Sequence, residues 1–118
     1  MTELRRMCFT VDLHDDPGLI AHYRAWHGPG AVPKPVVKAM RADDIRALEI
    51  WLHGTRMFLI MDVGPGFDPV AKAVRDADNP DVQDWDRLMR TFQKPPPGAA
   101  AGETWVAMDR IHALSEQD

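Results

Sequence analysis

The chain has 118 residues, 45% of them hydrophobic and 27% charged, and a formal net charge of -4 at pH 7. These values are typical of one globular domain, which we expect to span residues 1–118. The negative charge argues against nucleic acid or an anionic membrane as a partner, and no run of about 18 apolar residues is present to span a bilayer. Cys8 is the only cysteine, which excludes a disulfide framework, and the N-terminal residues lack the apolar region of a signal peptide. We therefore expect a cytoplasmic protein.

A strand is predicted first, over residues 6–13. Apolar side chains alternate there with small or polar ones, which is the two-residue period of a strand with one apolar face. Asp12 lies on the polar face, where a carboxylate is unusual because strands are depleted in acidic residues. Asp12 is therefore a candidate binding residue, with a structural role at the edge of the sheet as the alternative.

A helix over residues 16–27 follows. Asp16 can accept hydrogen bonds as the N-cap, and Pro17 suits the first helical position, where its missing N–H costs nothing. Tyr23 and His27 are four residues apart and are therefore neighbours on one face. Both side chains can donate and accept protons, and imidazole does so near neutral pH. The pair is either a proton-transferring site or the amphipathic border of a core.

The middle of the chain predicts a short helical segment over residues 36–40 and then a hairpin. The loop GPGAVPKP precedes that segment. Residues 47–52 and 56–63 have the patterns of two antiparallel strands, and the HGT between them is a three-residue connection containing glycine. The second of these strands is apolar on both faces, which places it in the centre of the sheet. Trp51 and Glu49 lie on the face opposite the leucines of the first.

Two helices and a last strand complete the predicted elements. A cap followed by proline begins a helix at Asp68, and a second such signal opens the helix over residues 81–92, whose apolar stripe includes Trp85. The segment 93–103, rich in proline, alanine and glycine, predicts an unpacked linker. Residues 103–114 then alternate as a strand does.

The order strand, helix, strand, strand, helix, strand is the ferredoxin-like βαββαβ pattern, an α+β fold. It predicts a four-stranded antiparallel sheet with helices on one face. The other face carries Thr10, Asp12, Glu49 and Trp51, and this mixture of polar groups with an aromatic suits a wet pocket. An uncovered face also favours packing against a second copy, so we expect a symmetric homodimer that forms a dimeric α/β barrel.

Other patterns favour structural roles. The histidines show no metal-ligand spacing, and the HDD at 14–16 fits turn and capping chemistry better than a cation site. The two GPG segments lack the lysine and the helix of a phosphate loop. Cys8 has no paired base nearby in the sequence, which disfavours a nucleophilic thiol. We therefore predict no metal and no cofactor. Trp51 and Trp85 could also be plain core residues.

Six segments carry a resemblance to a known family: RMCFTVDL, YRAWH, LEIWL, RMFLIMDV, NPDVQDWDRLM and ETWVAMDRI. Together they span nearly the whole chain, and over that length it resembles the L-rhamnose mutarotase family. The resemblance implies a small ferredoxin-like protein that interconverts the anomers of a deoxy-sugar. The Tyr-x-x-x-His motif of the first helix is its most specific part.

The resemblance also implies roles for individual residues. In the family, the tyrosine and histidine of this motif line the sugar pocket and the histidine is catalytic, which carries over to Tyr23 and His27. An aromatic on the second strand corresponds to Trp51, and a tryptophan on the late helix to Trp85. Three departures from the family pattern suggest a sugar other than L-rhamnose: Trp51 stands where tyrosine is usual, Asp86 replaces a second tryptophan found in some members, and VPK at 32–34 replaces a segment such as WPE. The opening and closing strands resemble the L-fucose branch.

The expected reaction is general acid–base opening and reclosure of the sugar ring, which needs no metal or covalent intermediate. We assign His27 as the main acid and base, and Tyr23 as its partner or as a group that binds a hydroxyl. Asp12 would orient His27 or bind a sugar hydroxyl. Trp51 and Trp85 would pack against the sugar's C–H face and methyl group.

Two other functions remain open from the sequence. The same fold serves dimeric α/β barrels that bind haem or other ligands without mutarotase activity, in which His27 would be an axial ligand or only a pocket wall. A dimerisation module without catalysis is the third reading. It predicts no anomer exchange above background with any aldose.

Overall fold

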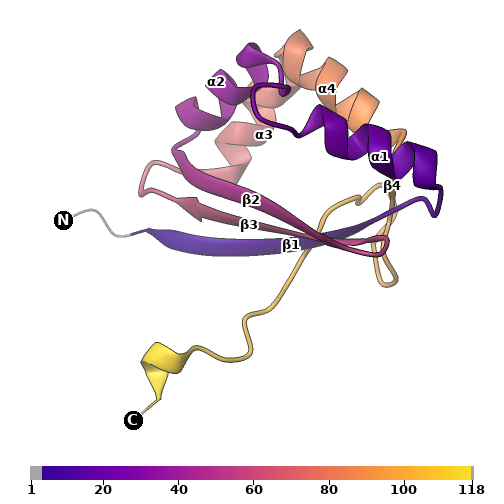
Figure 1. Cartoon of the computed structure of the whole chain (residues 1–118). Helices are drawn as coiled ribbons and strands as arrows, with labels where there is room; N and C mark the ends of the chain where they lie inside the picture. Colours follow the sequence, from indigo (N-terminus) through magenta and orange to yellow (C-terminus); the bar gives the residue numbers. More distant parts are fainter. Residues whose placement is uncertain (1–3, 118) are drawn as a thin grey trace.

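The computed structural model describes residues 4–117, which form an antiparallel sheet with α-helices on one of its faces (Figure 1). In chain order the elements are β1 (Arg5–Leu13), α1 (Pro17–Trp26), α2 (Lys34–Ala42), β2 (Ile45–His53), β3 (Arg56–Val63), α3 (Pro69–Ala77), α4 (Pro80–Arg90), β4 (Gln93–Lys94), β5 (Val106–Ala107) and the 3-10 helix η1 (Leu114–Glu116). None of the helices in this part of the chain has the length and apolar composition needed to cross a membrane.

The strand order is β2-β3-β1-β4, with β5 also pairing with β1, and every pair is antiparallel. This order confirms the predicted ferredoxin-like sheet and the internal position of β3. The predicted hairpin is present, but its connection has two residues instead of three, because His53 already pairs with Arg56. Gly54 has φ +61 in this turn, a conformation that glycine adopts without a side-chain clash.

The fourth strand differs from the prediction of a continuous strand over residues 103–114. β4 pairs with the end of β1 and β5 pairs with its middle, so two short segments share the strand position beside β1. The chain leaves the sheet between them, where three successive prolines at 95–97 cannot donate ladder hydrogen bonds. The expectation of an unpacked linker is also wrong, because Gln93 and Pro96 are buried.

The helices begin where the sequence predicts. Asp16, Asp68 and Asn79 each accept hydrogen bonds from backbone N–H groups of the first turn that follows, and each is followed by a proline. These interactions satisfy donors that have no partner inside the helix. α2 is longer than the predicted segment over residues 36–40. Its C-terminal neighbour Asp43 is buried and is paired with Lys72 and Arg75 of α3, which ties these two helices together.

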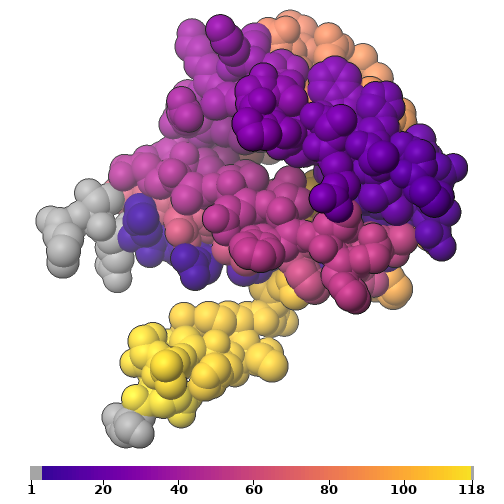
Figure 2. All heavy atoms as spheres, in the orientation of Figure 1, coloured from indigo at the N-terminus to yellow at the C-terminus, as the bar shows by residue number. Residues whose placement is uncertain are grey.

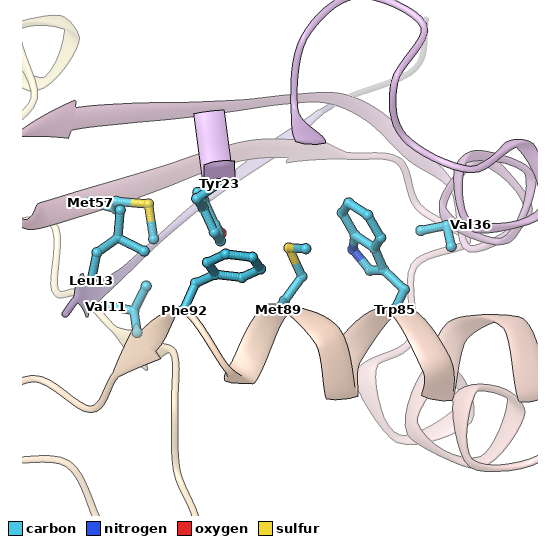
Figure 3. Close-up of a cluster of buried hydrophobic side chains, with 8 residues drawn as sticks. All are labelled: Val11, Leu13, Tyr23, Val36, Met57, Trp85, Met89 and Phe92. Carbon is cyan, nitrogen blue, oxygen red and sulfur yellow. The ribbon is translucent and has the colours of Figure 1, made fainter. Parts of the chain in front are cut away.

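The main core fills the space between the helices and the sheet (Figure 3). Its buried members are Val11, Leu13, Tyr23, Val36, Met57, Trp85, Met89 and Phe92. Figure 3 shows that Trp85, Met89 and Phe92 point from α4 and its C-terminal end toward Tyr23 and the strands. A second cluster of Ile45, Met61, Val63 and Phe67 packs at the other end of the sheet. The face of the sheet that meets the helices is therefore the densely packed one.

Within residues 4–117 no α-helix covers the opposite face, and the C-terminal segment with η1 leaves the body on that side (Figures 1 and 2). Two cross-strand ion pairs lie on this face: Arg6 with Asp62, and Asp12 with Arg56. Trp51 is 61% exposed there. This uncovered face is polar with scattered aromatics, as the sequence predicts.

Candidate active site

A cavity of about 630 Å³ lies between the helices and the sheet, which is a usual size for a small-molecule site. Its floor includes Leu48, Ile50 and Leu59 from β2 and β3, and the helices and the residues just before β5 supply its walls. The prediction of a cavity on the uncovered face is therefore wrong. The strand side chains that line the cavity belong to the apolar alternation, and the helices above them leave the space.

Tyr23 and His27 both line this cavity, and their ring centroids are 4.3 Å apart. Tyr23 is in the second turn of α1 and is only 3% exposed. His27 is the C-cap residue of the same helix and is half-buried. The adjacency predicted from their spacing of four residues is confirmed, and the pair faces enclosed space instead of bulk solvent.

The His27 ring is held by a hydrogen bond to the backbone one helical turn earlier. Its Nδ1 lies 2.8 Å from the carbonyl oxygen of Tyr23. A carbonyl oxygen can only accept, so the proton of the neutral ring lies on Nδ1. The lone pair of the neutral ring is then on Nε2, which makes Nε2 the atom that can take a proton from a ligand.

The Tyr23 hydroxyl has a protein partner that the sequence did not indicate. Gln93 donates a hydrogen bond from Nε2 to Tyr23 Oη over 3.1 Å, and both residues are buried. Burial raises the pKa of Tyr23 above its usual value of 10.0, and the hydrogen bond from Gln93 partly opposes this effect. The phenol is therefore protonated at neutral pH. The one sequence signal for Gln93 is a polar residue directly after the apolar stripe of α4.

Trp85 forms the wall next to the histidine. Its ring lies edge-on to His27 at a centroid distance of 5.5 Å and edge-on to Trp26 at 5.9 Å. Trp85 is a member of the buried core and also lines the cavity. Trp85 is therefore a core residue that also presents an aromatic surface to the enclosed space.

Asp12 and Trp51 do not join this group. They point to the uncovered face, because they alternate with Val11 and Ile50, which face the helices. Asp12 accepts hydrogen bonds from Arg56, one of them at 3.2 Å, and the indole N–H of Trp51 donates to a carboxylate oxygen of Glu49 at 3.1 Å. Within one chain the sheet separates these residues from His27, so the prediction that they line the same cavity is wrong.

The matching family model is described as L-rhamnose mutarotase and covers residues 6–114. The chain belongs to the L-rhamnose mutarotase family. A relative in this comparison, an L-fucose mutarotase of Xanthomonas campestris, is 48% identical over 113 residues, which cover 96% of this chain and 90% of the relative. A UPF0734 protein of Dictyostelium discoideum is 32% identical over 108 residues, covering 88% of this chain and 85% of that protein.

The fold of this mutarotase-family chain agrees with a solved structure. The crystal structure of an L-rhamnose mutarotase from Formosa agariphila superposes with a TM-score of 0.68 at 14% sequence identity. The match covers 93% of this chain and 98% of that chain. At such low identity the likeness bears on the fold alone, and it supports the mixed α/β architecture with an antiparallel sheet.

Two of the three departures from the pattern of the mutarotase family lie in the cavity wall, and Trp51 does not. Val32 contributes from the loop before α2, and Asp86 contributes from α4. Desolvation by the surrounding protein raises the pKa of the Asp86 carboxyl, and Arg90 opposes this shift. Lys72 and Asp76 add further polar groups to this end of the cavity. The space therefore has an apolar floor and a polar end, which suits a molecule with both hydroxyl groups and C–H surfaces.

Within residues 4–117 no three His, Cys, Asp or Glu side chains are grouped so that they could hold an ion. The HDD segment at 14–16 instead precedes α1, where Asp16 acts as the N-cap. The groups that the cavity offers are proton donors, proton acceptors and aromatic surfaces.

Proposed function

We propose that this protein interconverts the α and β anomers of a 6-deoxy-L-hexose, with L-fucose as its preferred substrate. Membership of the mutarotase family supports the reaction, and the 48% identity to an L-fucose mutarotase supports the sugar. The observation that carries the proposal is the contact between Tyr23 and His27 in the cavity wall, with His27 Nδ1 already occupied by a backbone carbonyl.

The reaction requires two proton transfers at neighbouring oxygens. Ring opening removes the proton from the anomeric hydroxyl, breaks the bond between the anomeric carbon and the ring oxygen, and gives the ring oxygen a proton. In our proposal Nε2 of His27 takes the first proton and the Tyr23 hydroxyl gives the second. Rotation of the free aldehyde and closure on its other face return both protons, so the two side chains end as they began.

The other cavity residues would bind the sugar and exclude water. The face of Trp85 offers an apolar surface for the C–H groups of the ring. Leu48, Ile50 and Leu59 offer apolar contacts for the 6-methyl group. We place Asp86 against a sugar hydroxyl, because its carboxylate can accept a hydrogen bond and it lies where some family members have a tryptophan.

The deciding experiment is substitution of the histidine. His27→Ala removes the general base and should slow anomer exchange of L-fucose by about 10²–10⁴-fold, measured by saturation-transfer NMR on the anomeric protons. His14→Ala is the matched control, because His14 is exposed in the loop before α1 and does not line the cavity. Undiminished exchange in the His27 variant would rule out the proposed role. The family match gives no support to haem binding, and a Soret band in purified protein would revive that alternative.

We also propose that two copies associate through the uncovered face of the sheet, in the cytoplasm. Trp51 and Phe58 pair across β2 and β3 and are both exposed on that face. Ile111 in the C-terminal segment is 96% exposed, and that segment leaves the body on the same side (Figures 1 and 2). Exposed apolar side chains gathered on one side are a common property of association surfaces. The single cysteine supports a reducing compartment.

A further inference from the structure

We propose that Gln93 is a positioning residue for the reaction: its side-chain amide directs the Tyr23 proton into the cavity and stabilises the phenolate that forms when this proton leaves. The inference rests on the proposed function for the reaction, but its central claim concerns Tyr23 and can be tested without any sugar. Gln93 is not part of the Tyr-x-x-x-His motif and lies 70 residues along the chain from Tyr23.

The position of Gln93 is fixed by the sheet. It is the first residue of β4 and pairs with Leu13 at the end of β1, so its backbone is anchored in the ladder. Its side chain is only 7% exposed. A buried amide is costly unless its hydrogen-bonding groups find partners. The side-chain amide N–H of Gln93 donates to the Tyr23 hydroxyl, and both residues line the cavity.

The direction of this hydrogen bond determines where the phenol proton points. The amide nitrogen of Gln93 can donate but cannot accept, so the Tyr23 hydroxyl is the acceptor. The hydroxyl's own hydrogen must then point away from Gln93. Tyr23 is buried among core residues and borders the cavity. A proton acceptor can therefore reach the hydroxyl hydrogen of Tyr23 from the cavity.

The same hydrogen bond grows stronger as the reaction proceeds. Burial alone makes it harder for Tyr23 to lose its proton, and this would oppose its role as an acid. A hydrogen bond to an anion is roughly twice as strong as one between neutral groups. The Gln93 amide therefore stabilises the phenolate more than the phenol, which lowers the barrier without tightening the binding of the substrate.

The chain offers an unusually direct probe of this idea, because Tyr23 is its only tyrosine. Protein labelled with ¹³C at the tyrosine ζ carbon gives one resonance, and its pH titration reports the pKa of Tyr23. In Gln93→Met, which keeps the length of the side chain but removes the donor, this pKa should rise. The turnover number for L-fucose should fall by about 10–100-fold with little change in KM, the range for a lost hydrogen bond to a charged group.

Gln83→Met is the matched control for the titration. Gln83 also lines the cavity, but its amide donates to the backbone carbonyl of Asp76 at 2.8 Å, so the pKa of Tyr23 should stay at the wild-type value. If Gln93→Met does not fold, Gln93→Glu provides the second test. A carboxylate at this position repels the phenolate and should also raise the pKa of Tyr23.

The outcomes separate this inference from the proposed function. An unchanged or lowered Tyr23 pKa in the Gln93 variants would overturn it, because a fall means that the amide carbonyl accepts the phenol proton. A raised pKa with unaltered turnover would overturn the catalytic part. If His27→Ala keeps full activity while the Tyr23 pKa still responds to Gln93, the proposed function fails and the hydrogen bond stands.

Discussion

Along β1, Val11 and Leu13 are almost completely buried under the helices, whereas Asp12 between them points the other way and is paired with Arg56. β2 repeats this contrast, with Ile50 packed against the core and Trp51 exposed. The strands thus supply two unlike surfaces from alternate residues. What covers each surface sets its character: the helix layer encloses a cavity lined by Tyr23 and His27, and the uncovered face carries exposed ion pairs.

The electrostatics of the two faces differ in the same way. On the uncovered face Arg6 donates to Asp62 and holds the pKa of that carboxyl below its usual range, as a partner of opposite charge does. On the cavity side, partial desolvation raises the pKa of Asp86, although this residue remains exposed. Exposed ion pairs contribute little to stability, about 0–1 kcal/mol. The two faces therefore shift the pKa values of their carboxyl groups in opposite directions.

The largest contrast should be in stability, between neighbouring residues of β3. Met57→Ala removes a fully buried side chain on the covered face and should lower the free energy of unfolding by about 2–5 kcal/mol. Phe58→Ala, on the exposed face, should cost about 1 kcal/mol, because its side chain is already partly in water. Urea unfolding of the two variants measures both values. Equal losses would mean that the uncovered face is as important for folding as the core.

The next contrast concerns the two tryptophans assigned to the sugar. Trp85→Ala should raise KM for L-fucose by about tenfold, equivalent to about 1.4 kcal/mol of lost contact with the ring. Trp51→Ala should leave the exchange rate per chain within about twofold and weaken self-association, measured by sedimentation at several concentrations. The opposite result, with Trp51 altering KM in a monomer, would place the sugar on the uncovered face.

The smallest effects should appear in the pH dependence of stability. The pKa of Asp86 is raised above 3.8, so the folded state binds more protons than the unfolded state just above that pH, and stability falls as pH rises through this window. Asp86→Asn should therefore raise the melting temperature at pH 7 and leave it unchanged well below pH 3.8.

Asp62→Asn is the counterpart with the opposite sign. The folded-state pKa of Asp62 is lowered, so its contribution is present above 3.8 and is lost as pH falls through the folded value. This variant should melt slightly lower than wild type at pH 7. Thermal unfolding followed by circular dichroism between pH 3 and pH 7 measures both variants. Shifts of the same sign would contradict the difference between the two faces.

Local rules made much of the fold predictable. Asp16 with Pro17 marks a helix start in any context, and a spacing of four residues makes Tyr23 and His27 neighbours on any helix. The face of the sheet on which the cavity lies could not be predicted in this way. It depends on which face the helices cover, and the alternation of strand residues is the same in either case. Gln93 could not be predicted as a site residue, because its hydrogen-bond partner Tyr23 lies far away in the sequence.

The divided fourth strand has a consequence for how this enzyme family can diversify. Residues 95–105 leave and rejoin the same edge of β1, and the last two of them, Thr104 and Trp105, line the cavity wall. Doubling the length of such a loop costs only about 0.6 kcal/mol of closure entropy. Insertions and deletions there can reshape the cavity while strand register and the contact between Tyr23 and His27 are left untouched, so new sugar preferences can arise without rebuilding the scaffold.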